Sequence, residues 1–455
     1  MQTITEQPPR GTEPYLERFE AFEKQDGHFP PWLLSIRKAA MARFAERGFP
    51  KTKDEDWRFT NVAPIAKLPF QPVFQHEPGA VSPKELTKFH FAELNCHRLV
   101  FVNGHFAPEL STSPPRKPGL TLGSLTEALT EDPARVQKLL ASVRNERDAF
   151  AALNTAFFMD GAFIQLPAGM VLAEPVHLLF ISTSPEPGAA SHPRNLILAG
   201  KESRLTIIES YVSATPESSF TNALTQFVIR ENARVEHCKF QDEAWSAFHI
   251  AGLEMELGRN CNFISHSIAA GARLSRNNIN TLLNGEGCEC VLNGLYLTKD
   301  DQLADHHMIV EHAKAHCNSH EYFNGILDDR SKGVFHGRIL VQQEAQKTDA
   351  KQTNKNLLLS DNATVDTKPQ LEIYADDVRC THGATVGQLN DESIFYLRAR
   401  GIGLQTARRM LIHAFAAEII DRIRCEPLRQ EMDRIIWDRL EQNPHVGAGA
   451  DGPER

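Results

Sequence analysis

The sequence predicts a mainly β protein, in which a right-handed parallel β-helix core is flanked by N-terminal and C-terminal α-helical regions. Between about residues 162 and 394, short strand-like runs follow one another and convincing helical patterns are missing. Within this part a loose self-similarity returns about every 27 residues, which is typical of stacked-repeat architectures. Apolar residues return to helical spacing at both ends of the chain. These observations divide the chain into residues 1–160, 161–400 and 401–455.

The repeat is carried by four similar segments, at residues 232–237, 260–266, 287–293 and 315–320. Each unit holds two or three short strands and turns that carry Gly or Asn. In a parallel β-helix each coil covers the apolar face of the coil below, so equivalent residues stack on one another. A large antiparallel β-sandwich is the alternative architecture. Rossmann and TIM-type folds are excluded because alternating helices are missing.

The N-terminal region reads as a flexible tail over residues 1–12, followed by helices. Residues 15–23 can form a short helix. A better one begins at Pro31 and ends before Gly48, with Pro in the first turn and Gly just past the end. Further along, residues 98–102 predict a strand before a turn at Asn103-Gly104, and residues 125–158 return to helix. The polar stretch with Glu55-Asp56-Trp57-Arg58 is interpreted as a capped loop with one aromatic anchor, or as a partner contact.

The C-terminal region predicts two amphipathic helices, at residues 405–424 and 428–440. Such a stripe of apolar residues usually packs against its own domain. Helices added to a β-helix would also cap its open end, where unpaired strands are otherwise exposed. Residues 443–455 are expected to be a disordered tail.

Composition and charge exclude several classes of protein. The chain has 455 residues, 41% of them hydrophobic, with a net charge of −9 and a pI of about 6.1. Nucleic acid and anionic membranes are poor partners for such a chain, because no long basic run occurs. No apolar run approaches the roughly 20 residues that a membrane helix needs. The first residues lack the basic and apolar parts of a secretory signal, so we expect a cytoplasmic protein.

Eight cysteines are scattered along the chain, and their spacing excludes the familiar cysteine motifs for metal binding and redox chemistry. The closest pair is Cys288-Glu289-Cys290, and no Cys-x-x-Cys occurs. Zinc-ribbon, ferredoxin-type and thioredoxin-like sites are therefore absent. A metal centre on this chain would therefore have to share ligands with a partner or use His and carboxylate. Most repeat cysteines are interpreted as small hydrophobic residues of the stacks: Cys261, Cys288 or Cys290, and Cys317.

Cys380 and His382 are the strongest candidate site residues. Val378, Cys380 and His382 alternate in a way that is typical of a strand, so the thiol and the imidazole share one face about 7 Å apart. That separation is too long for both to hold one metal easily, but short enough for both to line one site. Gly383 and Gly387 are interpreted as turns or bulges. The adjacent acids Asp376-Asp377 point to opposite faces and are interpreted as a turn or surface pair.

A dense histidine group precedes this stretch and is interpreted as structural. Metal ligation is the alternative, because imidazole suits Fe, Zn and Cu. Alternation along a strand sends adjacent imidazoles to opposite faces, and the later ones would share a face only in a helix. The group consists of His306, His307, His312, His316 and His320.

Residues 369–387 and 395–401 resemble a signature near the end of the β-helical core in the SufB/SufD family of iron–sulfur cluster scaffold proteins. Cys380-Thr381-His382-Gly383 and Tyr396-Leu397-Arg398-Ala399-Arg400-Gly401 are similar to the SufD branch. Further similar stretches are residues 153–157 before Asp160-Gly161, Pro50 with residues 55–58, and residues 414–418.

The resemblance implies a β-helix and a non-catalytic scaffold subunit of a SufBCD-type complex. It implies that His382, with a cysteine of a SufB-like paralogue, builds a nascent cluster or takes up iron at the subunit interface. Cys380 matches a nearby family cysteine and would be a secondary or structural ligand. The C-terminal helices would dock a SufC-like ABC ATPase, and deletion of residues 402–455 should abolish that binding. A homodimer is a possible form of the isolated chain.

Two other functions are weighed against this one. The chain could belong to the SufB branch, although extra cysteine motifs are missing. A polysaccharide lyase is the other alternative, because parallel β-helices often host such enzymes, but the acidic residues of the repeat do not cluster. No Walker A loop, Gly-x-Ser-x-Gly elbow or His-Glu-x-x-His motif occurs, so we expect neither ATP binding nor hydrolysis by this chain.

Overall fold

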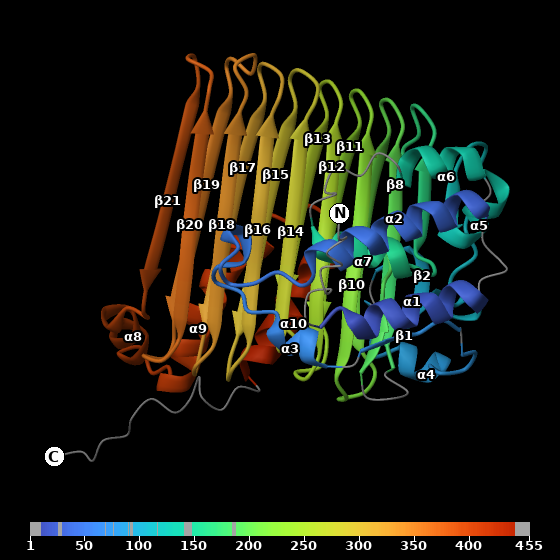
Figure 1. The fold of residues 1–455 in the computed structure, drawn as a ribbon. Coiled ribbons are helices and arrows are strands. Elements are labelled where there is room, and N and C mark those ends of the chain that lie inside the picture. Colours follow the sequence, from blue (N-terminus) through green and yellow to red (C-terminus); the bar gives the residue numbers. More distant parts are fainter. Residues whose placement is uncertain are drawn as a thin grey trace, which may run out of the picture.

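The computed structural model describes residues 11–441, except for residues 26–29, 69, 76, 90, 92–93, 116, 141–147 and 184–187. It confirms the parallel β-helix with helices towards both ends of the chain (Figure 1). The two tails predicted to be flexible lie mostly or wholly outside the described residues. No described helix is long and apolar enough to cross a membrane.

Two large sheets form the core, and strands that follow each other in the chain alternate between them from β8 onwards. Sheet A runs β20 (Thr364–Ile373), β18 (Lys332–Val341), β16 (Leu303–His312), β14 (Leu274–Leu283), β12 (Phe248–Leu257), β10 (Ser219–Ile229), β8 (Arg194–Ala199), β5 (Ala162–Leu166) and β4 (Thr121–Ser124), with β7 (Ala189–Ser191) and β1 (Gln71–Pro72) beside β10. Sheet B runs β21 (Arg379–Gly387), β19 (Asp349–Leu358), β17 (Asn318–Leu327), β15 (Glu289–Thr298), β13 (Asn262–Ala269), β11 (Arg234–Asp242), β9 (Arg204–Ser213), β6 (Val176–Ser182), β2 (His97–Val102) and β3 (His105–Phe106).

Strand pairing explains the repeat seen in the sequence. Phe220 pairs with Phe248 and Phe248 with Leu274, so one coil takes 28 and then 26 residues there. Near the C-terminal end Lys332 pairs with Thr364, 32 residues later. Each full coil holds two strands of about ten residues rather than two or three short ones. All these pairs are parallel, which excludes the antiparallel sandwich.

The turn that leads from sheet A into sheet B is the most regular part of the repeat. One residue in most of these turns has a positive φ, as in Asn232, Asn260, Gly287 and His316. Asn and Gly tolerate this left-handed conformation at low cost. The next residue of each turn is buried and stacks on its equivalent, which confirms the predicted ladder: Ala233, Cys261, Cys288 and Cys317. The thiol of Cys288 donates to the carbonyl of Gly258 at 2.9 Å.

Most of the N-terminal helices cover the outer face of sheet A. They include α1 (Glu13–Gln25), α2 (Pro31–Arg47), α5 (Leu125–Glu131), α6 (Pro133–Leu140) and α7 (Ala149–Phe157), with the short helix α3 (Ala63–Lys67) and the 3-10 turn η1 (Glu55–Trp57). The short helix α4 (Pro83–Leu86) and the 3-10 turn η2 (Pro108–Leu110) pack instead with apolar residues of sheet B, such as Val100 and Leu179. Aromatic side chains make the contact: Phe150 lies 6.2 Å from Phe220, measured between ring centroids. Figure 1 shows α1, α2 and α7 in front of the green strands.

The C-terminal helices α9 (Leu404–Ile420) and α10 (Glu426–Glu441) cover the outer face of sheet B. Ile412 and Ile419 are buried with outward-facing apolar residues of that sheet, such as Leu295 and Ile326. The expectation that these helices cap the open end was wrong. Their apolar stripe packs against the apolar outer face of sheet B instead. The last strands of both sheets, β20 and β21, therefore keep an unpaired edge among the described strands.

Two smaller expectations were also wrong. A helix, α8 (Asp391–Arg398), lies inside the segment that we assigned to the core, because the strands already end at Gly387. Gly383 is no turn but lies within β21. Because β21 is an edge strand, a Cβ at Gly383 would meet no atom within 4 Å.

Candidate functional site

The open end of the β-helix holds Cys380 and His382. Both lie on β21, which pairs only with β19 and therefore leaves its other edge free among the described strands. Cys380 is in register with Ala350, and His382 with Gln352. Cys380 packs with Ile339 and Ala350 at the inner side of the sheets. Alternation places His382 on the same face, as the sequence predicted.

The two side chains differ in exposure. His382 is exposed, whereas Cys380 is half-buried. Burial, with a smaller contribution from the Asp349 carboxylate, raises the pKa of the Cys380 thiol. The thiol therefore stays protonated near neutral pH until a metal or a positive group displaces its proton.

Below His382 a row of polar residues continues into the β-helix. His382, Gln352 and Glu321 follow each other in register on β21, β19 and β17. Glu321 is fully buried, and burial raises its pKa to about 8. Among the described residues neither carboxyl oxygen of Glu321 has a partner in hydrogen-bonding geometry, although Gln352 lies close enough to lower the pKa slightly. Gly337 on sheet A has no side chain, which leaves space for the side chains of Glu321 and Gln352.

Apolar side chains surround this open end. Exposed fractions are 40% for Ile373, 60% for Tyr374 and 51% for Val386, all on or beside the last two strands. On the following helix α8, Phe395 is 74% and Tyr396 56% exposed. An edge strand with free backbone groups and apolar neighbours is a template for pairing with another chain.

The predicted histidine group is spread over several environments. His306 and His307 do point to opposite faces of β16: His306 is buried between Tyr296 and Phe323, and His307 lies on the outer face. His312 is buried beside Ser319, His316 is a turn residue, and His320 pairs with Asp349. The five do not form one cluster.

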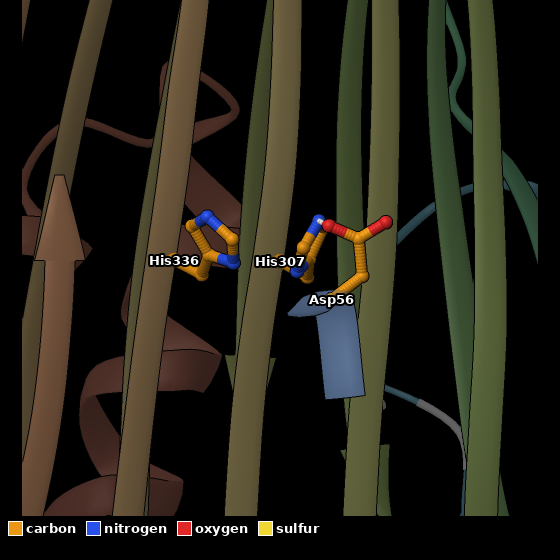
Figure 2. A group of neighbouring side chains, drawn as sticks. All are labelled: Asp56, His307 and His336. Carbon is orange, nitrogen blue, oxygen red and sulfur yellow. Dashed lines mark ion pairs between the residues drawn. The ribbon is translucent and has the colours of Figure 1, made fainter. Parts of the chain in front are cut away.

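His307 of that group lies close to His336 and Asp56, two residues that were not predicted from the sequence as candidate ligands. His307 lies next to His336 on β18, with ring centroids 4.3 Å apart, and its Nε2 is 3.7 Å from the Asp56 carboxylate (Figure 2). The potential ligand atoms of these three residues all lie within 4.8 Å of one another. The signal was in the sequence: His307 and His336 are 29 residues apart, one coil of the helix.

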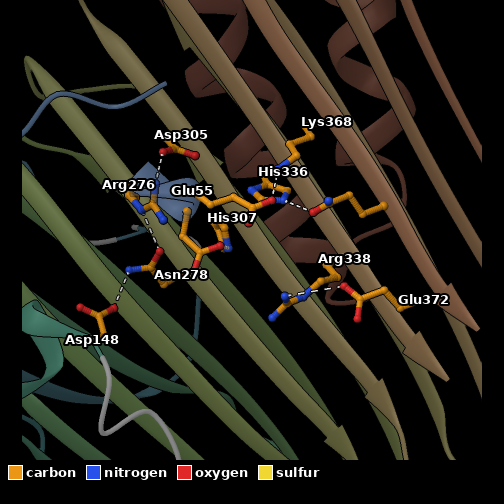
Figure 3. A network of polar contacts seen from close by, with 12 residues as sticks. Glu55, Asp148, Arg276, Asn278, Asp305, His307, His336, Arg338, Lys368 and Glu372 are labelled. Atoms are coloured by element: carbon orange, nitrogen blue, oxygen red, sulfur yellow. Dashed lines mark hydrogen bonds and ion pairs between the residues drawn. The ribbon is translucent and has the colours of Figure 1, made fainter. Parts of the chain in front are cut away.

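Paired charges surround this trio (Figure 3). Arg276 donates to Asp305 at 2.6 Å and stacks 3.7 Å from the ring of Trp57. Lys368 pairs with Glu55 at 2.8 Å. The segment around η1 is thus held against the outer face of sheet A, and the predicted aromatic anchor Trp57 serves a contact within the chain.

The interior of the β-helix holds a second charged cluster, which sequence reasoning missed. The Glu243 carboxylate lies 2.7 Å from His249 Nδ1, and Lys239 Nζ lies 2.8 Å from His249 Nε2. Glu209 lies 3.4 Å from His237. Burial lowers the pKa of Lys239 to about 8. Inward-facing charges in a strand look like surface residues in a sequence, so only the fold reveals them.

Two family models together match most of the chain. Residues 11–178 match the model of the SufBD protein N-terminal region, and residues 180–415 match the SufBD core domain of the SUF system for iron–sulfur cluster assembly.

Relatives match over most of the chain. The iron–sulfur cluster assembly protein SufD of Escherichia coli is 35% identical over 86% of this chain and 90% of its own. A SufBD family protein of Synechocystis is 31% identical over 89% of this chain and 90% of its own. SufD of Bacillus subtilis is 24% identical over 93% and 96%. The chain therefore belongs to the SufBD family of iron–sulfur cluster assembly proteins, and relatives named SufD are among those that it matches.

Proposed function

We propose that this chain is a non-catalytic SufD-type scaffold subunit that pairs with a SufB-like paralogue and contributes to cluster assembly at their interface. The observation that carries the proposal is the open end of the β-helix, where an unpaired strand edge, exposed apolar residues and the Cys380/His382 face occur together. The family assignment favours this function over a polysaccharide lyase.

In this proposal His382 is a shared ligand for iron or a transient iron–sulfur cluster, and the partner supplies the other ligands. An exposed imidazole on an edge strand can reach a group on a docked chain. Cys380 lies deeper and is a secondary ligand. Imidazole and thiolate are both iron ligands, and an incomplete set on one chain allows a cluster to be formed and then released. Iron and sulfide are cargo here.

The experiment is anaerobic co-expression with the SufB-like and SufC-like partners, followed by iron and sulfide analysis of the purified complex. We expect His382→Ala to leave the complex intact and to lower its iron and sulfide content. Thr381→Ala is the matched control, because Thr381 is also exposed but points to the other face of β21. An intact His382→Ala complex with unchanged content would refute the ligand role.

We further propose that a SufC-like ABC ATPase docks on the C-terminal helices. Deleting residues 402–455 is a poor test, because α9 and α10 cover apolar residues of sheet B and their loss would expose them. The exposed Met410 of α9 tests the surface more cleanly, because α8 lies at the open end that is assigned to the paralogue. We expect Met410→Asp to weaken co-purification of the ATPase and to leave the paralogue bound, and Glu392→Ala to leave ATPase binding unchanged. Unchanged ATPase binding by Met410→Asp would refute this surface.

We place the complex in the cytoplasm and assign neither nucleotide nor nucleic-acid binding to this chain. A homodimer through the same open end is the expected form when the paralogue is missing. A relative from Arabidopsis thaliana is named a chloroplastic protein, so fractionation of cells that express the native chain is the direct test of the compartment.

A further inference from the structure

Asp56, His307 and His336 form a compact trio on the outer face of sheet A. His307 and His336 are register partners on β16 and β18, so the pleat points both imidazoles outward side by side. Asp56 comes from η1, more than two hundred residues earlier in the chain, and lies over them (Figure 2). Three donor atoms from three separate segments thus converge within 4.8 Å.

Hydrogen bonds do not account for this arrangement. The 3.7 Å between His307 Nε2 and Asp56 is longer than a hydrogen bond. His307 is 4% exposed, yet its Nδ1 has no hydrogen-bond partner among the described residues. His336 Nε2 donates to the side-chain oxygen of Gln370 at 2.7 Å. That contact leaves the other ring nitrogen with a free lone pair, which is how metal-ligating imidazoles are usually held.

The basic residues around the trio do not oppose a bound cation, because their charges are neutralised. Three basic residues lie nearby, but each pairs with a carboxylate: Arg276 with Asp305, Lys368 with Glu55, and Arg338 with Glu372. The positive charges around the trio are therefore already neutralised by carboxylates.

We propose that Asp56, His307 and His336 bind a divalent first-row transition-metal ion such as Zn²⁺ or Fe²⁺, with water in the remaining positions. Two imidazoles and one carboxylate suit these ions. Metal–nitrogen bonds of about 2.1 Å require the donor atoms to lie about 3.4 Å apart. Asp56 is exposed and sits on a short 3-10 turn, so it can move the remaining distance.

The bound ion would fasten the η1 segment to strands from the far end of the β-helix. This site is separate from the proposed cluster site, which lies on the inner face of sheet B, whereas the trio lies on the outer face of sheet A. The two can therefore be tested independently, and the failure of one leaves the other standing.

The test uses the full chain without an affinity tag, in a Cys380→Ala/His382→Ala background that removes the other candidate ligands. The metal-free protein is titrated with Zn²⁺ by calorimetry and with Co²⁺ by visible absorption. We expect one ion per chain, a cobalt spectrum without thiolate-to-metal charge transfer, and protection of the η1 segment from proteolysis on binding.

Asp56→Asn and His336→Ala should each weaken binding at least about tenfold, since even the loss of an outer partner costs 10- to 100-fold. Asp56→Asn keeps the shape of an exposed side chain, so it should fold like the wild type. His320→Ala is the matched control, because His320 and Asp349 form a similar pair on sheet B that has no third ligand among the described residues. Binding that is absent in the parent, unchanged in Asp56→Asn and His336→Ala, or equally weakened in His320→Ala would overturn the assignment.

Discussion

Replacing Glu321 by Gln should stabilise the protein at neutral pH, by an amount that depends on pH in a defined way. Glu321 is fully buried between Leu292 and Gln352 in the stacked positions of sheet B. Burial raises its pKa from 4.5 to about 8, so the folded protein keeps this carboxyl protonated at pH 7. The unfolded chain exposes the group and loses the proton near its ordinary pKa.

The sign follows from linkage between proton binding and folding. Between about pH 4.5 and 8 the folded state binds more protons at this site than the unfolded state, so stability falls as pH rises. One pKa unit corresponds to about 1.4 kcal/mol, so the cost at pH 7 is about 3 kcal/mol and at pH 5 about 1 kcal/mol. Gln has nearly the same shape and no proton to lose, so Glu321→Gln removes this cost.

Urea unfolding followed by circular dichroism at about pH 5, 6 and 7 measures the effect. The free energy of unfolding of Glu321→Gln should exceed that of the wild type by a margin that grows with pH. Glu286→Gln is the control, since Glu286 is exposed in a turn and should show no such trend. A margin that is constant with pH, or that shrinks as pH rises, would show that Glu321 is ionised in the folded state and refute the reasoning.

Two further predictions concern packing and a buried ion pair. A Cβ on Gly294 would lie 2.0 Å from the ring of Phe323, so Gly294→Ala should destabilise by about 1–3 kcal/mol in urea unfolding, whereas Gly383→Ala should be nearly neutral. Asp305→Asn leaves the buried Arg276 unpaired and should cost about 3–5 kcal/mol; loss of less than about 1 kcal/mol in thermal or urea unfolding would mean that water reaches this pair.

The architecture could be predicted from the sequence because the turns repeat. Asn260 and Gly287 mark the left-handed position of successive coils, and the cysteines that follow them stack as expected. The surface on which the C-terminal helices pack could not be predicted. An amphipathic pattern indicates that one face of a helix is buried, but it does not identify the surface that buries it. Only the structure shows that the apolar outer face of sheet B receives it.

The candidate sites show the same limit. Cys380 and His382 share a strand, so their common face follows from alternation alone. His307 and His336 are one coil apart, and Asp56 reaches them from a distant segment, so their meeting depends on the exact length of the coils. Glu209 and Lys239 are charged residues inside the β-helix, where residue type alone would not place them.

The contact between Glu55 and Lys368 joins residues 313 positions apart. Stacked coils otherwise need only their neighbours, so a solenoid can grow one coil at a time as the chain is made. Here the η1 segment leaves the ribosome early, but its docking surface on β20 exists only when the last coils have folded. The Glu55–Lys368 contact therefore forms only after β20 has folded, whereas Trp57 can already dock on Arg276 of β14, and a chain truncated before β20 would lack this last tie.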